Sequence, residues 1–180
     1  MRKKIKIEVG VPEGIEANVA GGMVEVKGKE GSIKKNFSTG KIDMKKIGGN
    51  IVLESNAATK REKKQMHTIR AHLKNMIQGV EDKFEYKLKI CYSHFPFTVE
   101  VKGNEASIKN FLGEKNPRKI TIPSGAEINT DKEYITIKSV DKELAGQIAA
   151  NFEKLARVRS RDRRVFQDGI FMVNKAGKSI

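Results

Sequence analysis

A ten-residue segment occurs twice in this chain and limits the folds that the chain can adopt. Residues 24–33 read VEVKGKEGSI and residues 99–108 read VEVKGNEASI, so eight of the ten positions are identical at an offset of 75 residues. Two unrelated hairpins would rarely agree so closely. A repeat of this kind indicates a duplicated structural unit. We therefore expect two related modules in tandem.

Alternating apolar and polar residues surround both copies of the repeat. A period of two is typical of a strand with one buried face. The runs are residues 5–9, 23–26 and 51–53 in the first half, and residues 85–90, 98–101, 119–122 and 134–137 in the second. Residues 48–50 (Gly-Gly-Asn) and 129–132 (Asn-Thr-Asp-Lys) have the composition of hairpin turns. Each half therefore predicts an antiparallel sheet.

An amphipathic helix is predicted after the strands of each half, because apolar residues recur there at spacings of three and four. The first covers about residues 57–78, with Ser55 or Asn56 as its N-cap and Gly79 at its end. Its apolar face is Met66, Ile69, Leu73, Met76 and Val80. The second covers about residues 142–156 and begins after Asp141. Its apolar face is Leu144, Ile148, Phe152 and Leu155.

These elements predict an α+β fold of two tandem related modules, each an antiparallel sheet packed against one long helix. The first module is expected over residues 1–80 and the second over residues 83–157. Residues 158–180 are expected to form an arginine-rich C-terminal segment and tail. The length of 180 residues is sufficient for two small domains.

The charge of the chain points to a polyanionic partner. Lys and Arg number 36 against 22 Asp and Glu, a net charge of +14, and residues 1–82 and 83–180 each carry +7. Nucleic acid or an anionic membrane surface is the expected partner of so basic a protein. A membrane span is not expected, because no run of 18 apolar residues occurs. The N-terminus does not resemble a signal peptide, and the single Cys91 favours a reducing, cytosolic setting.

The densest functional signal is an arginine cluster after the second predicted helix. Five of the nine arginines fall within residues 157–164: Arg157, Arg159, Arg161, Arg163 and Arg164. Guanidinium groups bind phosphate oxygens bidentately, so we expect these residues to contact RNA phosphates, with Lys175 and Lys178 as lesser contributors. The alternative is a merely solvated helix end. Lys41, Lys45 and Lys46 suit RNA contact and a solvated rim equally well.

The residues after the arginines are expected to fix the cluster in space. Asp168-Gly169 suits a turn, and Phe166, Ile170 and Phe171 are candidates to pin the segment to the second module. The sequence leaves open whether the tail after Asp168 is ordered without RNA.

No catalytic, metal or cofactor site is predicted. His67 and His72 lie five residues apart on the first helix and point in different directions, so they do not share a metal. Cys91 and His94 supply only two candidate ligands. A phosphate-binding glycine loop, a Ser/His/Asp arrangement and a paired-carboxylate pattern are missing from the sequence. We therefore do not expect an enzyme, a cofactor or a small-molecule substrate.

With the repeat and the arginine cluster together, the sequence resembles the family of universal large-subunit ribosomal protein six, in its archaeal and eukaryotic form (the eukaryotic counterpart is numbered nine). The resemblance covers essentially the whole chain. It rests on residues 9–14 (VGVPEG), the two VEVKG segments and residues 161–171 (RDRRVFQDGIF). The bacterial signature Pro-Tyr-Lys-Gly-Lys-Gly is absent, so RNA contacts assigned through that motif do not transfer.

The resemblance implies a structural constituent of the large ribosomal subunit, located in the cytoplasm and built from two duplicated α+β modules. It implies binding to large-subunit (23S-type) rRNA, mainly through the second module and the tail. The implied location is near the region where translation factors dock and the base of the lateral stalk, beside neighbouring large-subunit proteins. The low arginine content of the first module (Arg2, Arg61 and Arg70) leads us to expect that it is a spacer and a protein-facing surface. Composition alone leaves an alternative, a non-ribosomal basic RNA-binding regulator or RNA chaperone.

Overall fold

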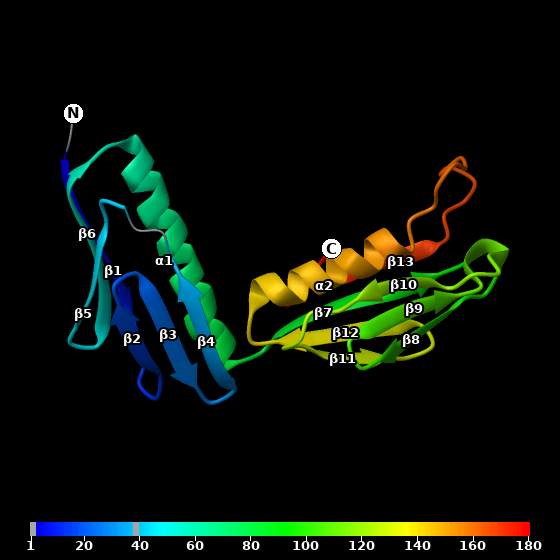
Figure 1. The fold of residues 1–180 in the computed structure, drawn as a ribbon, viewed down its shortest axis with the longest axis horizontal. Helices are drawn as coiled ribbons and strands as arrows, with labels where there is room; N and C mark the ends of the chain where they lie inside the picture. Colours follow the sequence, from blue (N-terminus) through cyan, green and yellow to red (C-terminus); the bar gives the residue numbers. More distant parts are fainter. Residues whose placement is uncertain (1–2, 38–39) are drawn as a thin grey trace. The chain divides into compact units, whose positions relative to one another are not determined.

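The chain folds as two units that meet between Lys83 and Phe84. The computed structural model describes residues 3–37 and 40–180 (Figure 1). Each unit contains one long helix and antiparallel strands, and the same order of a strand, a hairpin and a later helix occurs in both. The predicted α+β fold of two related modules is therefore confirmed.

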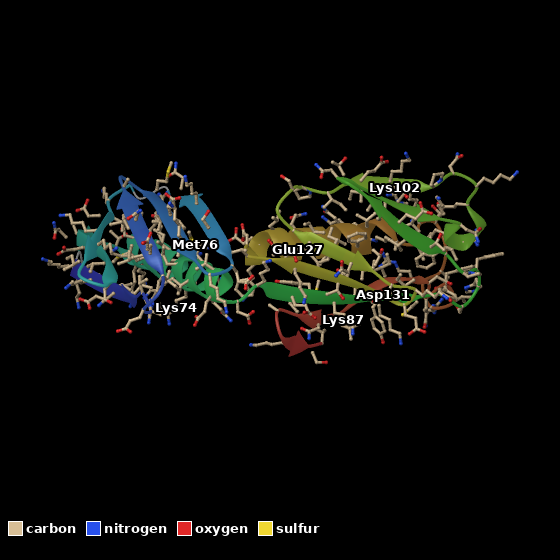
Figure 2. All side chains as sticks on the ribbon, turned by 90° about the horizontal axis from the view of Figure 1, so that it is seen from below. Lys74, Met76, Lys87, Lys102, Glu127 and Asp131 are labelled. Atoms are coloured by element: carbon tan, nitrogen blue, oxygen red, sulfur yellow. The ribbon has the colours of Figure 1, made fainter. Side chains whose placement is uncertain are left out.

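The first unit has two three-stranded sheets among its described residues. One sheet has the order β1-β6-β5 and the other β2-β3-β4. Helix α1 packs against strands of both sheets. Lys74 and Met76 of α1 lie on opposite sides of the helix, the former exposed and the latter buried (Figure 2). The elements are β1 (Lys3–Gly10), β2 (Glu16–Ala20), β3 (Met23–Gly28), β4 (Gly31–Asn36), β5 (Asp43–Ile47), β6 (Asn50–Ala58) and α1 (Lys60–Glu81).

Helix α1 begins and ends later than predicted. Strand β6 runs on to Ala58, which pairs with Lys3, so Ser55 and Asn56 lie in a strand and cannot cap the helix. Thr59 is the N-cap, and a reciprocal capping box joins it to Glu62. Gly79 does not end the helix: it is buried within it, and the last helical residue is Glu81. The predicted apolar face of the helix is correct.

The second unit has a five-stranded sheet and a three-stranded sheet among its described residues. Their orders are β11-β12-β7-β13-β14 and β10-β9-β8. Helix α2 begins after Asp141, as predicted, and its Ile148 and Phe152 enter a core shared with both sheets. The elements are β7 (Phe84–Cys91), β8 (Thr98–Lys102), β9 (Glu105–Lys109), the 3-10 turn η1 (Phe111–Gly113), β10 (Arg118–Thr121), β11 (Glu127–Thr130), β12 (Tyr134–Ser139), α2 (Lys142–Leu155), β13 (Gly169–Lys175) and β14 (Lys178–Ser179).

The C-terminal tail is part of the second unit's main sheet. Strand β13 pairs with β7 from Gly169 opposite Cys91 to Lys175 opposite Tyr86. The predicted turn at Asp168-Gly169 is wrong, because Gly169 is the first residue of this strand and Asp168 is buried. Of the three predicted apolar anchors, Ile170 is in the core, whereas Phe171 is half exposed. The sheet, and not a turn, therefore fixes the segment after the arginines.

The two copies of the repeat form hairpins in different registers. In the first, Val26 pairs with Ile33 and the chain reverses at Lys29 and Glu30. In the second, Val99 pairs with Ile108 and the chain reverses at Gly103 and Asn104. The two registers differ by an even number of residues, so each aligned side chain keeps its face of the sheet. The duplicated sequence therefore preserves the buried pattern while the turn moves.

Candidate nucleic-acid interface

The arginine cluster lies on a loop, residues 156–168, that joins the end of α2 to strand β13. The loop starts at buried Ala156 and ends at buried Asp168. All five predicted arginines lie between these two residues and are exposed. Figure 1 shows the loop projecting from the end of α2 before the chain returns as β13. Its length gives the arginines access to solvent, and its two buried ends hold it to the second unit.

Arg118 holds the N-terminal end of the loop in place through hydrogen bonds. Its Nη1 donates hydrogen bonds to the carbonyl oxygens of Leu155 and Arg157, both at 2.9 Å. These are carbonyls at the end of α2, where a helix leaves acceptors without partners. Its Nε donates to Glu114 at 2.7 Å, and its guanidinium carbon lies 4.3 Å from the centre of the Phe111 ring. This arginine therefore holds the loop and is not itself presented to a ligand.

Asp168 holds the C-terminal end of the loop in place. Its Oδ1 accepts hydrogen bonds from the backbone N–H groups of Ser93 (2.7 Å) and His94 (3.1 Å), and its Oδ2 lies 2.6 Å from His94 Nδ1. Burial opposes ionisation of this carboxyl, but the two backbone N–H groups and the His94 side chain outweigh that effect and lower the pKa of Asp168 to about 2. The carboxylate thus ties the loop to residues that follow β7.

A stack of side chains supports the middle of the loop. The Arg161 guanidinium carbon lies 4.7 Å from the centre of the Phe166 ring. The other neighbour of Phe166 is the His94 ring, stacked at 4.6 Å between centroids. Phe166 therefore does pin the segment, as predicted, but through His94 and not through the hydrophobic core. An exposed cation on an aromatic face gains about 0.5–1 kcal/mol.

The five arginines differ in how much of their charge is already balanced. Arg164 forms an ion pair with Asp162, at 2.8 Å between Nη2 and Oδ2, and this pair raises the pKa of Arg164 and lowers that of Asp162. Hydrogen bonds from Arg118 lower the pKa of Glu114, and the charges of Arg159 and Arg161 add to this effect. Within the described residues, Arg157, Arg159 and Arg163 form no ion pair with a carboxylate. These three are the most available to an anionic ligand.

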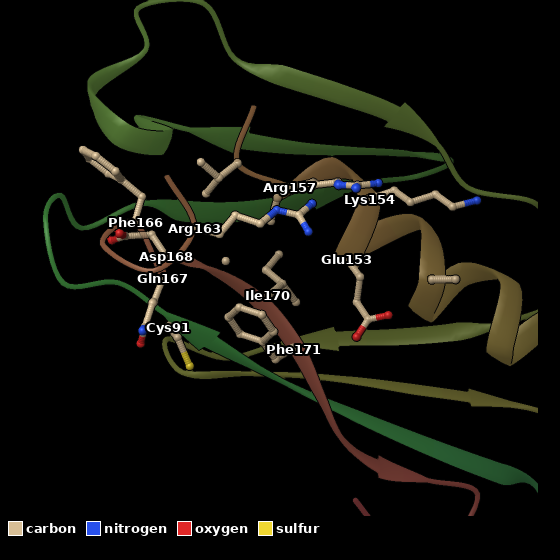
Figure 3. Close-up of a pocket in the computed structure, with 14 residues that line it drawn as sticks. Cys91, Glu153, Lys154, Arg157, Arg163, Phe166, Gln167, Asp168, Ile170 and Phe171 are labelled. Atoms are coloured by element: carbon tan, nitrogen blue, oxygen red, sulfur yellow. The ribbon is translucent and has the colours of Figure 1, made fainter. Parts of the chain in front are cut away.

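The loop borders two hollows on the surface of the second unit (Figure 3). The larger has a volume of about 810 Å³ and lies between the end of α2, the loop and the start of β13. The smaller, about 500 Å³, is lined by Lys154, Arg157, Val158, Arg159 and Arg163. Lys154 belongs to this cationic group, although no pattern in the sequence marks it as a candidate. Three of the five arginines, Arg157, Arg159 and Arg163, therefore border concave surface.

The structure does not bring Lys175 and Lys178 into the arginine cluster. They pair with each other across the β13–β14 hairpin. Lys175 lies at the far end of β13 from Gly169, about 20 Å along the strand at roughly 3.3 Å per residue. The two lysines are exposed. They are therefore candidates for a separate contact.

The basic residues of the first unit are less concentrated. Lys41, Lys45 and Lys46 are exposed before and on strand β5. Arg61 and Arg70 lie on α1, and Arg2 lies outside the described residues.

Two features of the described residues bear on other kinds of function. No helix there is long and apolar enough to cross a membrane. In residues 3–37 and 40–180, no three His, Cys, Asp or Glu side chains gather closely enough to hold a metal ion.

The sequence is similar to known proteins over nearly its whole length. The family model "Ribosomal protein L6" matches it twice, at residues 11–83 and 95–169. The chain belongs to the ribosomal protein L6 family. It is therefore not an enzyme, and its two matched copies agree with the two structural units.

Three archaeal relatives show the extent of the similarity. The "Large ribosomal subunit protein uL6" of Sulfurisphaera tokodaii is 43% identical over 93% of this chain and 91% of its own length. The protein of the same name from Methanobrevibacter smithii is 39% identical over 95% of this chain and 96% of its own. That of Methanococcus vannielii is 40% identical over 97% of this chain and 96% of its own.

Proposed function

We propose that this ribosomal protein binds large-subunit rRNA through the arginine loop, residues 156–168. Its family makes it a structural protein of the large ribosomal subunit, and so part of a cytoplasmic ribonucleoprotein that acts in translation. The proposal concerns which surface contacts the rRNA. The observation that carries it is the set of exposed arginines without carboxylate partners on a loop anchored at both ends.

The chemistry of the loop suits RNA backbone and not a single base sequence. A guanidinium group matches the geometry of phosphate oxygens, and its charge replaces a condensed counterion. Anchoring by Arg118 and Asp168 reduces the conformational entropy that the loop loses on binding. We expect the loop to contact phosphates at a junction or distorted helix and to recognise its shape.

The resemblance to large-subunit protein six supports a finer location. We place the arginine loop against rRNA near the site where translation factors dock and near the base of the lateral stalk. Neighbouring large-subunit proteins are the other expected partners. Lys175 and Lys178 would contribute a separate and smaller contact, because they lie at the other end of β13.

The salt dependence of binding tests the assignment. Each neutralised phosphate contributes roughly −0.9 to the slope of log affinity against log salt on duplex DNA, and about −0.7 on single strands. Changing Arg157, Arg159, Arg161, Arg163 and Arg164 to Ala should therefore flatten the slope by about three to five in filter-binding titrations with transcribed large-subunit rRNA.

A second variant distinguishes the effect of the arginine cluster on binding from the effect of net charge. Five lysines of the first unit (Lys41, Lys45, Lys46, Lys60 and Lys63) changed to Ala remove the same charge from a different surface. This variant should keep most of the wild-type slope. An unchanged slope in the five-arginine variant would contradict the proposal.

A further inference from the structure

The two hollows beside the arginine loop share one cationic wall. Lys154, Arg157 and Arg163 line both of them. In Figure 3 the guanidinium groups of Arg157 and Arg163 lie toward one side of the larger cavity, and Ile170 and Phe171 lie toward the other. The wall thus separates a mainly cationic hollow from a cavity with an apolar side. A nucleotide has the same division, because a charged phosphate is joined to a flat, largely apolar base.

The apolar side of the larger cavity suits a base. Phe171 is 49% exposed, because it lies on the face of β13 opposite to the buried Ile170, and its ring folds back over Gly169. A Cβ atom at Gly169 would lie 3.0 Å from Cζ of that ring, so a side chain there would displace it. Half-exposed aromatic faces are the surfaces on which unpaired bases stack. Ile170 and Ala156 lie beside the ring and continue the apolar lining.

Two carboxylates also line the cavity, and both accept hydrogen bonds from backbone N–H groups of the protein. Asp168 accepts hydrogen bonds from Ser93 and His94, and its side chain is almost fully buried. Glu153 Oε1 accepts a hydrogen bond from the backbone N–H of Met172 at 3.0 Å. The other oxygen of Glu153 remains an acceptor of the kind that pairs with the amino group of a base. The carboxylates therefore do not prevent a nucleotide from binding.

We propose that the larger cavity binds the base of one unpaired nucleotide of rRNA, and that the smaller hollow binds an adjoining phosphate. The volume of about 810 Å³ is within the range of cavities that enclose small organic ligands. Sequence-specific contacts to RNA are made mostly with unpaired, splayed-out bases. This inference rests on the proposed rRNA contact of the arginine loop and adds what the loop's cavity recognises.

Filling the cavity without changing charge tests the inference. Ala150 of α2 lines the cavity, and Ala150→Trp places an indole in it. Gln147→Trp adds the same side chain one turn earlier, at an exposed position outside the lining. With transcribed large-subunit rRNA in filter binding, Ala150→Trp should weaken binding at least tenfold with an unchanged salt slope, and Gln147→Trp should stay within twofold of wild type. Phe171→Ala, at the exposed edge, should weaken binding several-fold in the same way.

Cys91 gives a second readout that requires no substitution. It is the single cysteine of the chain and lines the same cavity. Its rate of reaction with a thiol reagent should fall at least tenfold when the protein is saturated with the rRNA. Equal binding by Ala150→Trp and wild type, or an unprotected Cys91 in the complex, would overturn the inference. Either result would leave the proposed function intact, because that function is tested by the salt slope of the five-arginine variant.

Discussion

At the scale of single residues, Asp162 limits the charge that the arginine loop presents. It pairs with Arg164, and its Oδ1 also accepts the backbone N–H of Arg164 at 2.9 Å. Asp162→Asn keeps an oxygen for that backbone hydrogen bond and releases the guanidinium. We expect tighter binding to large-subunit rRNA, by a few-fold at low salt, and a salt slope steeper by about one. The measurement is a filter-binding titration at several salt concentrations.

Asp141→Asn is the matched control for this variant. It removes the same charge at the N-cap of α2, where Asn caps equally well, and the helix separates it from the loop by about 20 Å at roughly 1.5 Å per residue. Its effect on binding should be small, because exposed charges more than about 10 Å apart are largely screened at 0.1 M salt. If both variants strengthened binding equally, the gain would come from net charge and not from Arg164.

The buried carboxylate of Asp168 makes the second unit sensitive to acid. Its pKa is about 2 in the folded chain, against an ordinary value of 3.8. A carboxyl whose pKa is lowered by folding stabilises the protein fully above the unfolded pKa, and this stabilisation is lost as the pH falls through the folded pKa. At roughly 1.4 kcal/mol per pKa unit, the contribution is about 2 kcal/mol.

Urea unfolding of wild type and Asp168→Asn measures this contribution. The variant should be less stable by about 2 kcal/mol at pH 6, and the difference should shrink between about pH 4 and pH 2. His94 is the titratable side chain that faces this carboxylate. A difference that does not change with pH would show that Asp168 acts only through packing.

Single residues also show how far the sequence can be interpreted. The arginine cluster was recognisable because its five residues fall within eight consecutive positions of the chain. The two residues that hold the loop, Arg118 and His94, act on partners 37 and 74 residues away. A lone Arg and a lone His carry no sign of a partner so distant. The ligand-facing charges could therefore be predicted, and the supports that position them could not.

At the scale of elements, Gly28 sets how closely strand β3 approaches helix α1. A Cβ atom there would lie 2.8 Å from the carbonyl oxygen of Val80 and 2.9 Å from its Cγ2. Because the obstacle includes helix backbone, Gly28→Ala should lower the stability of the first unit by about 1–3 kcal/mol. Thermal unfolding of the full chain followed by circular dichroism would measure the loss.

Gly49→Ala is the control for Gly28→Ala. Gly49 lies in the β5–β6 turn without a left-handed backbone, and a Cβ atom there meets nothing within 4 Å. Its effect should be less than about 1 kcal/mol in either direction. A cost at Gly28 no larger than at Gly49 would mean that the strand and helix adjust freely.

The boundaries of elements were predicted less well than their existence. Thr59 and Glu62 have the spacing of a capping box, a local signal that marks the start of α1, but the prediction placed the cap at Ser55 or Asn56 instead. The register of the two repeat hairpins was harder to predict than a helix boundary. The aligned strands of the two copies pair in registers that differ by two residues. Either register buries the same faces, so the hydrophobic pattern alone does not select one.

At the scale of the whole molecule, the repeat predicted two α+β modules, and the structure has them. It did not predict that each unit divides its strands between two sheets. Short strands with alternating residues give the same pattern in one sheet or in two, because only contacts between distant residues decide which strands pair. The tail likewise gave no sign that β13 would pair with β7 near the centre of the larger sheet.

The two units allow two determinants of rRNA binding to be compared: the net charge of a unit and the arrangement of its basic residues. Residues 1–83 contain 18 Lys and Arg against 10 Asp and Glu, and residues 84–180 contain 18 against 12. The first unit is thus the more basic, but six of the nine arginines lie in the second. We expect the fragment 84–180 to bind large-subunit rRNA within about tenfold of the full chain, because it holds the whole arginine loop and its anchors. The fragment 1–83 should bind only at the non-specific level.

Circular dichroism first shows that each fragment is folded. Filter binding of the two fragments in parallel then distinguishes net charge from the anchored loop as the determinant of affinity. If net charge determined affinity, the fragment 1–83 would bind at least as tightly as the fragment 84–180, since it carries more positive charge. If the anchored loop determines affinity, the order is reversed, and the salt slope of the full chain is reproduced by the second fragment alone. The first unit is then free to serve as a spacer and as a surface for neighbouring proteins. Tighter binding by the fragment 1–83 would move the principal rRNA contact to the first unit.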